Sequence, residues 1–179
     1  MTDLAATSTD AADIDADLLV LAVAEPDLDR GDWFAGIDAR VGGVLRRAAG
    51  EERFRAKLGQ TLIVHVRDVR PQRVALVGLG AAPDPSGQAL RVAAGSAARV
   101  ATGVGAARVA FAWSAAGVTI AEVRACEVAA EGALLGGYRF DKYLTDERSR
   151  RPALAAFTLR PPSGVAAPDA APAFARAQA

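Results

Sequence analysis

The sequence predicts a layered α/β domain built around a mixed, mostly parallel sheet. Apolar runs of strand length alternate along the chain with segments of helical periodicity. In addition, residues 17–24 and 73–77 are almost continuously apolar, as expected of strands that are covered on both faces. Such alternation is typical of a sheet that lies between layers of helices.

In the first half of the chain, we expect strands at residues 17–24, 61–66 and 73–77. The first and third are continuous apolar runs, whereas the second is β-branched and alternates weakly. Between them, residues 37–49 predict a helix despite two glycines. Its apolar positions have the spacing of one helix face: Ile37, Val41, Val44, Leu45 and Ala48.

In the second half, Ser86 is suited to cap a helix whose apolar face includes Leu90 and Ala94. A strand at 108–113, a long helix at 117–136 and a short strand at 155–159 follow. The long helix carries a narrow stripe of small residues, which predicts a close approach of its backbone to a sheet. That stripe consists of Ala121, Ala125, Val128 and Gly132.

The composition indicates one neutral domain. The chain has 179 residues, 21 basic and 21 acidic side chains, 43 alanines, one histidine and one cysteine. An internal disulfide is excluded, and one histidine with one cysteine cannot build a typical zinc site. We expect a flexible N-terminal flank (1–16), a domain (17–160) and an Ala/Pro-rich linker (161–179) that runs into a truncated helix. The start lacks the basic residues of an export signal, so we expect a cytoplasmic protein without membrane contact.

A glycine pair after a buried strand is the first candidate site. Gly78-Leu79-Gly80 has the spacing of a phosphate-binding turn, but Pro83 stands where a third glycine would open a helix. We therefore favour a plain turn. His65 and Cys126 are each isolated from other ligand types in the sequence, and both are interpreted as structural.

Two charged segments remain. Glu127 and Glu131 lie one helical turn apart near Arg124, and without further carboxylates we interpret them as an exposed charged face. Residues 138–151 carry five basic and three acidic side chains interleaved with aromatic residues. This segment could contact DNA, but the small surplus favours a solvated loop or a subunit contact. No catalytic, metal-binding or cofactor-binding residue is predicted.

Four sequence blocks have a recognisable order and spacing: residues 59–62 (GQTL), 73–80 (RVALVGLG), 90–94 (LRVAA) and 131–143 (EGALLGGYRFDKY). Over roughly residues 15–160, they resemble the N-terminal domain of the leucyl (cytosol) aminopeptidase family. The last block is the most specific and is similar to the signature that closes that domain. The first two are similar to an upstream block of the family, and the third is similar to the helix that follows it. The signature residues are Gly78, Gly80, Glu131, Gly132, Tyr138, Arg139, Phe140, Asp141 and Tyr143.

The resemblance implies a macro-domain-like, three-layer fold and a place in a metalloaminopeptidase that releases N-terminal amino acids. In that family, two divalent metal ions, Mn or Zn, and the catalytic residues belong to a C-terminal domain whose motifs no residue here matches. The resemblance further implies a hexamer and a catalytic-domain partner, with residues 174–179 resembling the start of the inter-domain helix. The leading hypothesis is a non-catalytic domain for assembly or regulation. The alternatives are an ADP-ribose-binding macro-type module and a DNA-binding accessory domain.

Overall fold

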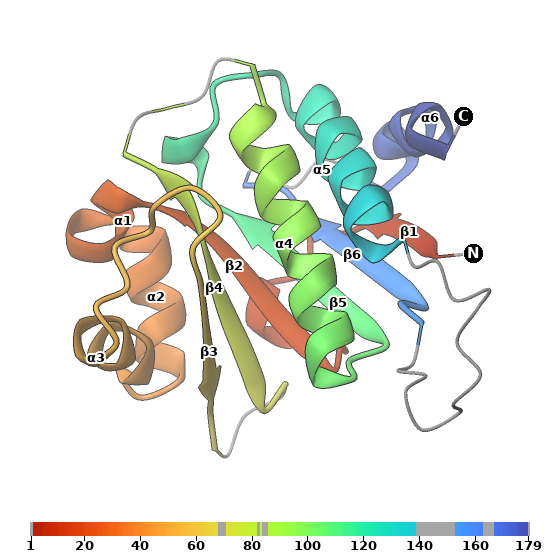
Figure 1. The fold of residues 1–179 in the computed structure, drawn as a ribbon. Coiled ribbons are helices and arrows are strands. Elements are labelled where there is room, and N and C mark those ends of the chain that lie inside the picture. Colours follow the sequence, from red (N-terminus) through yellow and green to blue (C-terminus); the bar gives the residue numbers. More distant parts are fainter. Residues whose placement is uncertain are drawn as a thin grey trace.

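In the computed structural model, a central sheet separates two layers of helices (Figure 1). The structure describes residues 2–67, 71–81, 83, 86–138, 153–162 and 167–178. Within these residues the sheet has six strands in the order β1-β6-β5-β2-β4-β3. The strands are β1 (Asp3–Ala6), β2 (Leu18–Ala24), β3 (Thr61–His65), β4 (Arg73–Gly80), β5 (Arg108–Trp113) and β6 (Ala156–Arg160).

All neighbouring strands are parallel except β3, which pairs antiparallel with β4 at one edge. This confirms the predicted mixed, mostly parallel sheet. The helices are α1 (Glu25–Arg30), α2 (Asp32–Arg40), α3 (Val44–Glu51), α4 (Gln88–Val104), α5 (Glu122–Gly137) and α6 (Ala167–Gln178). Helices α1–α3 cover one face of the sheet, and α4 and α5 cover the other.

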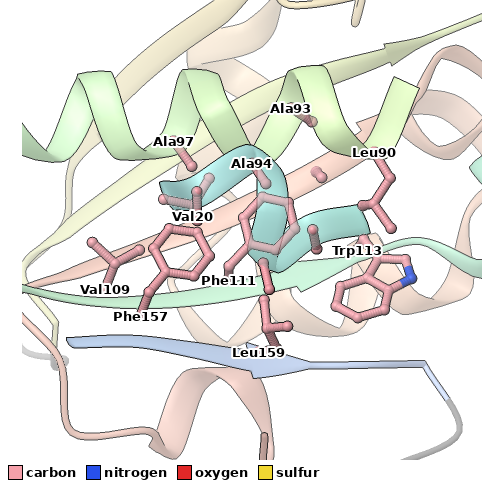
Figure 2. Packing of buried hydrophobic residues seen from close by; sticks show 14 of the residues in the cluster. Val20, Leu90, Ala93, Ala94, Ala97, Val109, Phe111, Trp113, Phe157 and Leu159 are labelled. Carbon is pink, nitrogen blue, oxygen red and sulfur yellow. The ribbon is translucent and has the colours of Figure 1, made fainter. Parts of the chain in front are cut away.

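Strand β2 is buried along its whole length because it contributes to two cores. Leu18, Val20 and Ala22 point toward α4 and α5, whereas Leu19 and Leu21 point toward α1–α3. The core under α4 and α5 contains the larger aromatic residues of β5 and β6 (Figure 2). Phe111 packs there with its ring centroid 6.0 Å from that of Trp113 and 5.5 Å from that of Phe157. A continuous run of apolar residues in the sequence therefore reflects burial of the strand on both faces.

Helices α4 and α5 touch backbone to backbone through glycines. A Cβ atom added to Gly132 would lie 2.2 Å from the carbonyl oxygen of Arg91, and one added to Gly136 would lie 2.3 Å from that of Gly95. The small-residue stripe was thus correctly expected to allow a close approach, but its Gly132 faces helix α4 rather than the sheet. The reason is that α4 and α5 lie side by side in one layer (Figure 1).

The N-terminal flank, expected to be flexible, belongs to the sheet. Strand β1 pairs in parallel with β6, and the Thr2 hydroxyl donates a hydrogen bond of 3.0 Å to the carbonyl oxygen of Leu154. Farther along, Arg40 binds Asp10 and Asp13, which ties this segment to α2. The expectation was wrong because β6 offers an unpaired edge, and edge pairing stabilises four residues with little strand propensity of their own.

Two predicted helices have different bounds. The helix expected at 37–49 is divided into α2 and α3, because Gly42 and Gly43 both adopt a φ of 73° and the Asp38 carboxylate accepts a hydrogen bond of 2.8 Å from the Leu45 backbone N–H. The helix expected at 117–136 begins at Glu122, after a short 3₁₀ turn, Ala115–Gly117.

The C-terminal segment, expected to be a linker (161–179) that runs into a truncated helix near residues 174–179, contains the longer helix α6. It begins at Ala167 and includes Pro172. Ala170, Ala173 and Phe174 are buried, and α6 packs against α5. Pro172 lies inside the helix and removes one backbone hydrogen bond, so packing of the buried α6 residues against α5 stabilises the helix in spite of it.

The glycine contact between α4 and α5 makes a testable prediction. Gly132→Ala should destabilise the fold by about 2 kcal/mol, because the new methyl group meets fixed backbone rather than a movable side chain. Gly36→Ala is the matched control: Gly36 is also helical, and its added Cβ would meet nothing within 4 Å. The control should be stabilising by about 0.5–1 kcal/mol. Urea unfolding measures both, and equal stability of Gly132→Ala and the native protein would contradict the contact.

Candidate interaction surface

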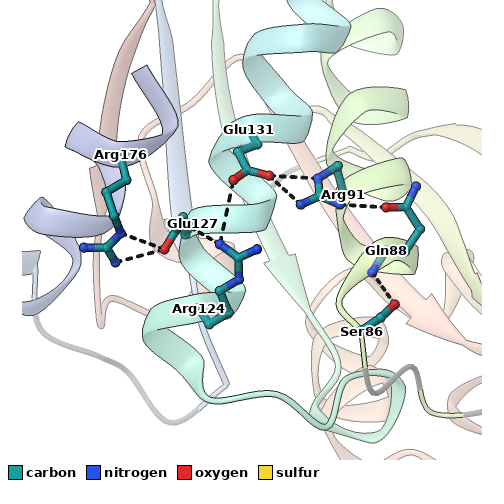
Figure 3. Close-up of polar contacts among 7 residues, drawn as sticks. All are labelled: Ser86, Gln88, Arg91, Arg124, Glu127, Glu131 and Arg176. Atoms are coloured by element: carbon teal, nitrogen blue, oxygen red, sulfur yellow. Dashed lines mark hydrogen bonds and ion pairs between the residues drawn. The ribbon is translucent and has the colours of Figure 1, made fainter. Parts of the chain in front are cut away.

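The outer face of α5 carries two carboxylates that hold the neighbouring helices α4 and α6 (Figure 3). On the α4 side, the Nε and Nη2 atoms of Arg91 donate to the Glu131 carboxylate at 2.9 and 2.5 Å. Arg91 also donates to the side chain of Gln88 at 2.7 Å. Both ionic side chains are about one quarter exposed, at 28% and 27%. Partial burial strengthens this contact relative to a fully solvated pair.

On the α6 side, Glu127 accepts hydrogen bonds from two arginines. Arg176 of α6 donates to it from Nε at 3.0 Å, and Arg124, one turn earlier in α5, donates from Nη1 at 2.5 Å. The Arg176 hydrogen bond is the main cause that lowers the pKa of the Glu127 carboxyl below its ordinary value, against the opposing effect of burial. Arg124 also lies 3.8 Å from Glu131, so the two carboxylates share one network.

This geometry corrects the prediction of an exposed charged face. Glu127 is buried, and Glu131 is half-buried between helices. The sequence placed both acids on one side of a helix but could not supply Arg91 and Arg176, whose partners lie 40 and 49 residues away in the chain. The pair acts as a clamp between helices and is not an acid/base couple.

Beside this network, the ends of α5 and α6 form a groove of about 510 Å³. Its apolar wall includes Leu134 and Leu135 of α5, the adjoining Tyr138, and Ala177 of α6. Leu135 is 72% exposed and Tyr138 is 74% exposed, which makes them the most exposed of the large hydrophobic side chains described. An apolar, aromatic patch next to ordered charges is typical of a surface that contacts protein.

The structure brings only some of the signature residues together. Glu131 and Tyr138 line the groove, and Gly132 supports it from the α4 contact. Gly78 and Gly80 lie elsewhere, at the end of β4. The signature residues Arg139, Phe140, Asp141 and Tyr143 lie outside the described residues, as does almost all of the 138–151 segment considered for DNA contact.

Gly78 and Gly80 serve backbone packing. A Cβ atom at Gly78 would lie 2.1 Å from the carbonyl oxygen of Lys57, and Gly80 has a φ of 96°. Their N–H groups donate to the carbonyl oxygens of Gln60 and Ala56 at 2.8 and 2.9 Å. The expected plain turn is instead the bonded end of a strand. With these donors already paired, the segment does not offer the free N–H groups that a phosphate requires.

The two isolated candidates, His65 and Cys126, lie in different environments. His65 is exposed on the edge strand β3. Cys126 is buried in α5, and this burial raises the pKa of its thiol to about 12, so it stays protonated at neutral pH. Among the described residues, no group of three or more His, Cys, Asp or Glu side chains could hold a metal ion. The donor set for the two metal ions that the resemblance implies is not found in this part of the chain.

Comparison of structures defines the class of the domain. A solved structure of a tomato leucine aminopeptidase mutant matches with a TM-score of 0.85 and 21% identity, covering 99% of this chain and 36% of that one. A Trypanosoma brucei macrodomain, solved in complex with ADP, matches with a TM-score of 0.63 and 15% identity over 99% of this chain and 69% of that one. The fold is therefore an α/β fold of macro-domain type, as predicted.

Sequence comparison identifies the family. The chain matches the cytosol aminopeptidase family, N-terminal domain, over residues 20–147, and it belongs to this family. A probable cytosol aminopeptidase of Geobacter sp. is 38% identical over 135 residues. That match covers 75% of this chain but only 27% of the Geobacter protein. The chain thus spans about a quarter of that relative. Within the described residues, none of the helices has the length and apolar character to cross a bilayer.

The ion-pair clamp predicts a pH-dependent stability. Glu127→Gln should lower the free energy of unfolding at pH 7 by about 1 kcal/mol, because both arginine contacts lose their charge partner and the arginines are half exposed. The pKa of Glu127 in the folded protein lies below its ordinary value of 4.5. The stabilisation that the ionised carboxylate gives the folded state is therefore complete above pH 4.5, and it is lost as the pH falls through the folded pKa.

Urea titrations at pH 7 and at a series of acidic values measure this difference. Glu52→Gln is the control, because Glu52 is exposed and lies beyond the end of α3. It should change stability by less than about 0.5 kcal/mol at each pH. A loss for Glu127→Gln that stays constant from neutral pH to the acid end would show that charge is not the cause.

Proposed function

We propose that this chain is a non-catalytic N-terminal domain of a leucyl aminopeptidase-type metallopeptidase and that it serves assembly. The surface proposed for this role is the groove between α5 and α6, and its partner is the catalytic domain of the same enzyme. The observation that carries the proposal is the exposure of Leu135 and Tyr138 beside the ordered ion-pair network. By extension, we propose that the complete enzyme forms the hexamer that the family resemblance implies.

The position of the groove supports this partner. Its second wall is α6, the last helix described, with Ala177 and Gln178 in the lining. In relatives of which this domain is the N-terminal quarter, the remaining polypeptide follows the domain. A groove beside the C-terminal helix is therefore close to the polypeptide that continues in such relatives. Burying a leucine and a tyrosine there would contribute about 25 cal/mol for each Å² of apolar surface removed from water.

The chemistry of the described residues supports a non-catalytic role. Metal-dependent peptide hydrolysis needs a metal-activated water held by several ligands. The carboxylates of the α5 surface are instead bound to arginines, which leaves Glu127 and Glu131 as anchors for helices. The two divalent ions, Mn or Zn, would then be held by the partner domain.

The first test is an activity assay. The purified chain, incubated with Mn²⁺ or Zn²⁺ and a leucine anilide, should show no metal-dependent turnover above the blank. A complete family enzyme, assayed in parallel, provides the positive control. Turnover that requires metal and remains after further purification to constant specific activity would contradict the non-catalytic assignment.

The second test concerns the groove. Leu135→Asp should weaken binding of the chain to a separately expressed catalytic domain by at least about tenfold, because a charge replaces an apolar contact at the centre of the patch. Leu58→Asp is the matched control, since Leu58 is also exposed, at 52%, but lies outside the groove. Isothermal titration calorimetry measures both affinities. Equal effects of the two substitutions, or none, would remove the groove from the interface.

A further inference from the structure

A second pocket lies on the opposite helix layer, between α1, α3 and the loop that follows α3. Its volume is about 320 Å³, and it is lined by acidic Glu25 and Asp29 of α1 and by basic Arg46 and Arg55. Leu28 and the buried Phe54 provide apolar lining. This size is at the lower end for small-molecule sites, and the combination of an apolar wall with a few charged groups is typical of them.

The four charged residues that line this pocket do not form ion pairs with one another. Among the described residues, none of the four forms an ion pair within 4.0 Å, although two acids and two arginines line the same pocket. Other charged pockets of the domain differ in this respect. Arg40 is paired with Asp10 and Asp13, and Arg108 is paired with Asp15 and Asp17. The four charged residues therefore line one pocket without being paired to one another.

Arg46 is the most informative of the four. Its Nε atom is buried and has no hydrogen-bond partner among the described residues, and it is the one such buried side-chain nitrogen or oxygen found there. The guanidinium group lies 5.7 Å from the centroid of the buried Phe34 ring, which holds it in place. A buried donor without an acceptor costs free energy, so the described residues leave the Arg46 guanidinium incompletely satisfied. The natural partner of a guanidinium is a carboxylate.

We propose that this pocket binds a free α-amino acid with an apolar side chain. The carboxylate of the ligand would accept hydrogen bonds from Arg46 and Arg55, and its ammonium group would donate to Glu25 or Asp29. The apolar side chain would lie against Leu28 and Phe54. A zwitterion matches both charge types of the pocket at once, whereas a simple anion would meet the like charges of the two acids.

The first experiment needs no variant. The isotope-labelled full chain is titrated with L-leucine, N-acetyl-L-leucine and L-leucinamide, and backbone amide shifts are followed by NMR. L-leucine should cause saturable shifts at residues 25–29 and 46–55. The two analogues lack the ammonium charge and the carboxylate respectively, so each should bind at least about tenfold more weakly. No saturation by about 10 mM L-leucine, or shifts confined to other elements, would overturn the proposal.

Variants then test the assignment of the charges. Arg46→Met keeps an apolar chain over Phe34 and should weaken L-leucine binding at least about tenfold. Arg47→Met is the control, because Arg47 is the adjacent, exposed arginine of α3 outside the pocket lining. Should Arg46→Met fail to fold, the double variant Glu25→Gln/Asp29→Asn replaces it with the same expectation, because it removes both acids that could bind the ammonium group. Unchanged affinity in Arg46→Met or in the double variant would refute the site.

This site is independent of the proposed function in assembly. Its lining is on α1 and α3, whereas the groove is on α5 and α6 on the other side of the sheet (Figure 1). Leu135→Asp should therefore leave L-leucine binding unchanged, and Arg46→Met should leave binding to the catalytic domain unchanged. Failure of one proposal can thus be recognised without affecting the other.

Discussion

The backbone contact between α4 and α5 determines the arrangement of one whole side of the molecule. At Gly132 and Gly136 there is no space for a side chain, since an added Cβ would lie 2.2 and 2.3 Å from carbonyl oxygens of α4. Such packing is rigid because backbone cannot move aside as a side chain can. It brings the helix axes close enough for Arg91 to reach Glu131, and it fixes the face of α5 that receives α6. The groove therefore depends on residues that do not line it.

The network on that face links three helices through two carboxylates. Glu131 faces α4 and Glu127 faces α6, so a single turn of α5 separates the two contacts. Helix α6 is rich in alanine, which favours a helix, but Pro172 lies inside it and removes a backbone hydrogen bond, so propensity alone does not explain where the helix lies. Packing of Phe174 and the Arg176 ion pair therefore account for its position. A surface held in this way is preorganised, and preorganisation lowers the entropic cost of association.

Much of the fold could be predicted from the sequence because β2, β4 and β5 are buried on both faces, and continuous apolar runs record that burial. Strand β1 could not, since its stability comes from the edge of β6 and not from its own four residues. Only part of the candidate site could be predicted from the sequence. Glu127 and Glu131 stood out as a charged helix face, and Tyr138 as the start of a separate charged and aromatic segment. Arg91 and Arg176 join the two carboxylates only through tertiary packing.

The ends of the parallel strands explain why both proposed sites lie on helices. In open α/β sheets, ligands commonly bind beyond the carboxyl ends of the strands. At the described end of β4, a Cβ at Gly117 would lie 2.6 Å from Leu79 Cδ1, and the Gly78 and Gly80 N–H groups are bonded to the segment 56–60. A shared fold with a macrodomain does not by itself carry over a nucleotide site. Among the described residues, the unpartnered Arg46 Nε and the exposed Leu135 both lie on the helix layers, which is why both proposed sites are placed there.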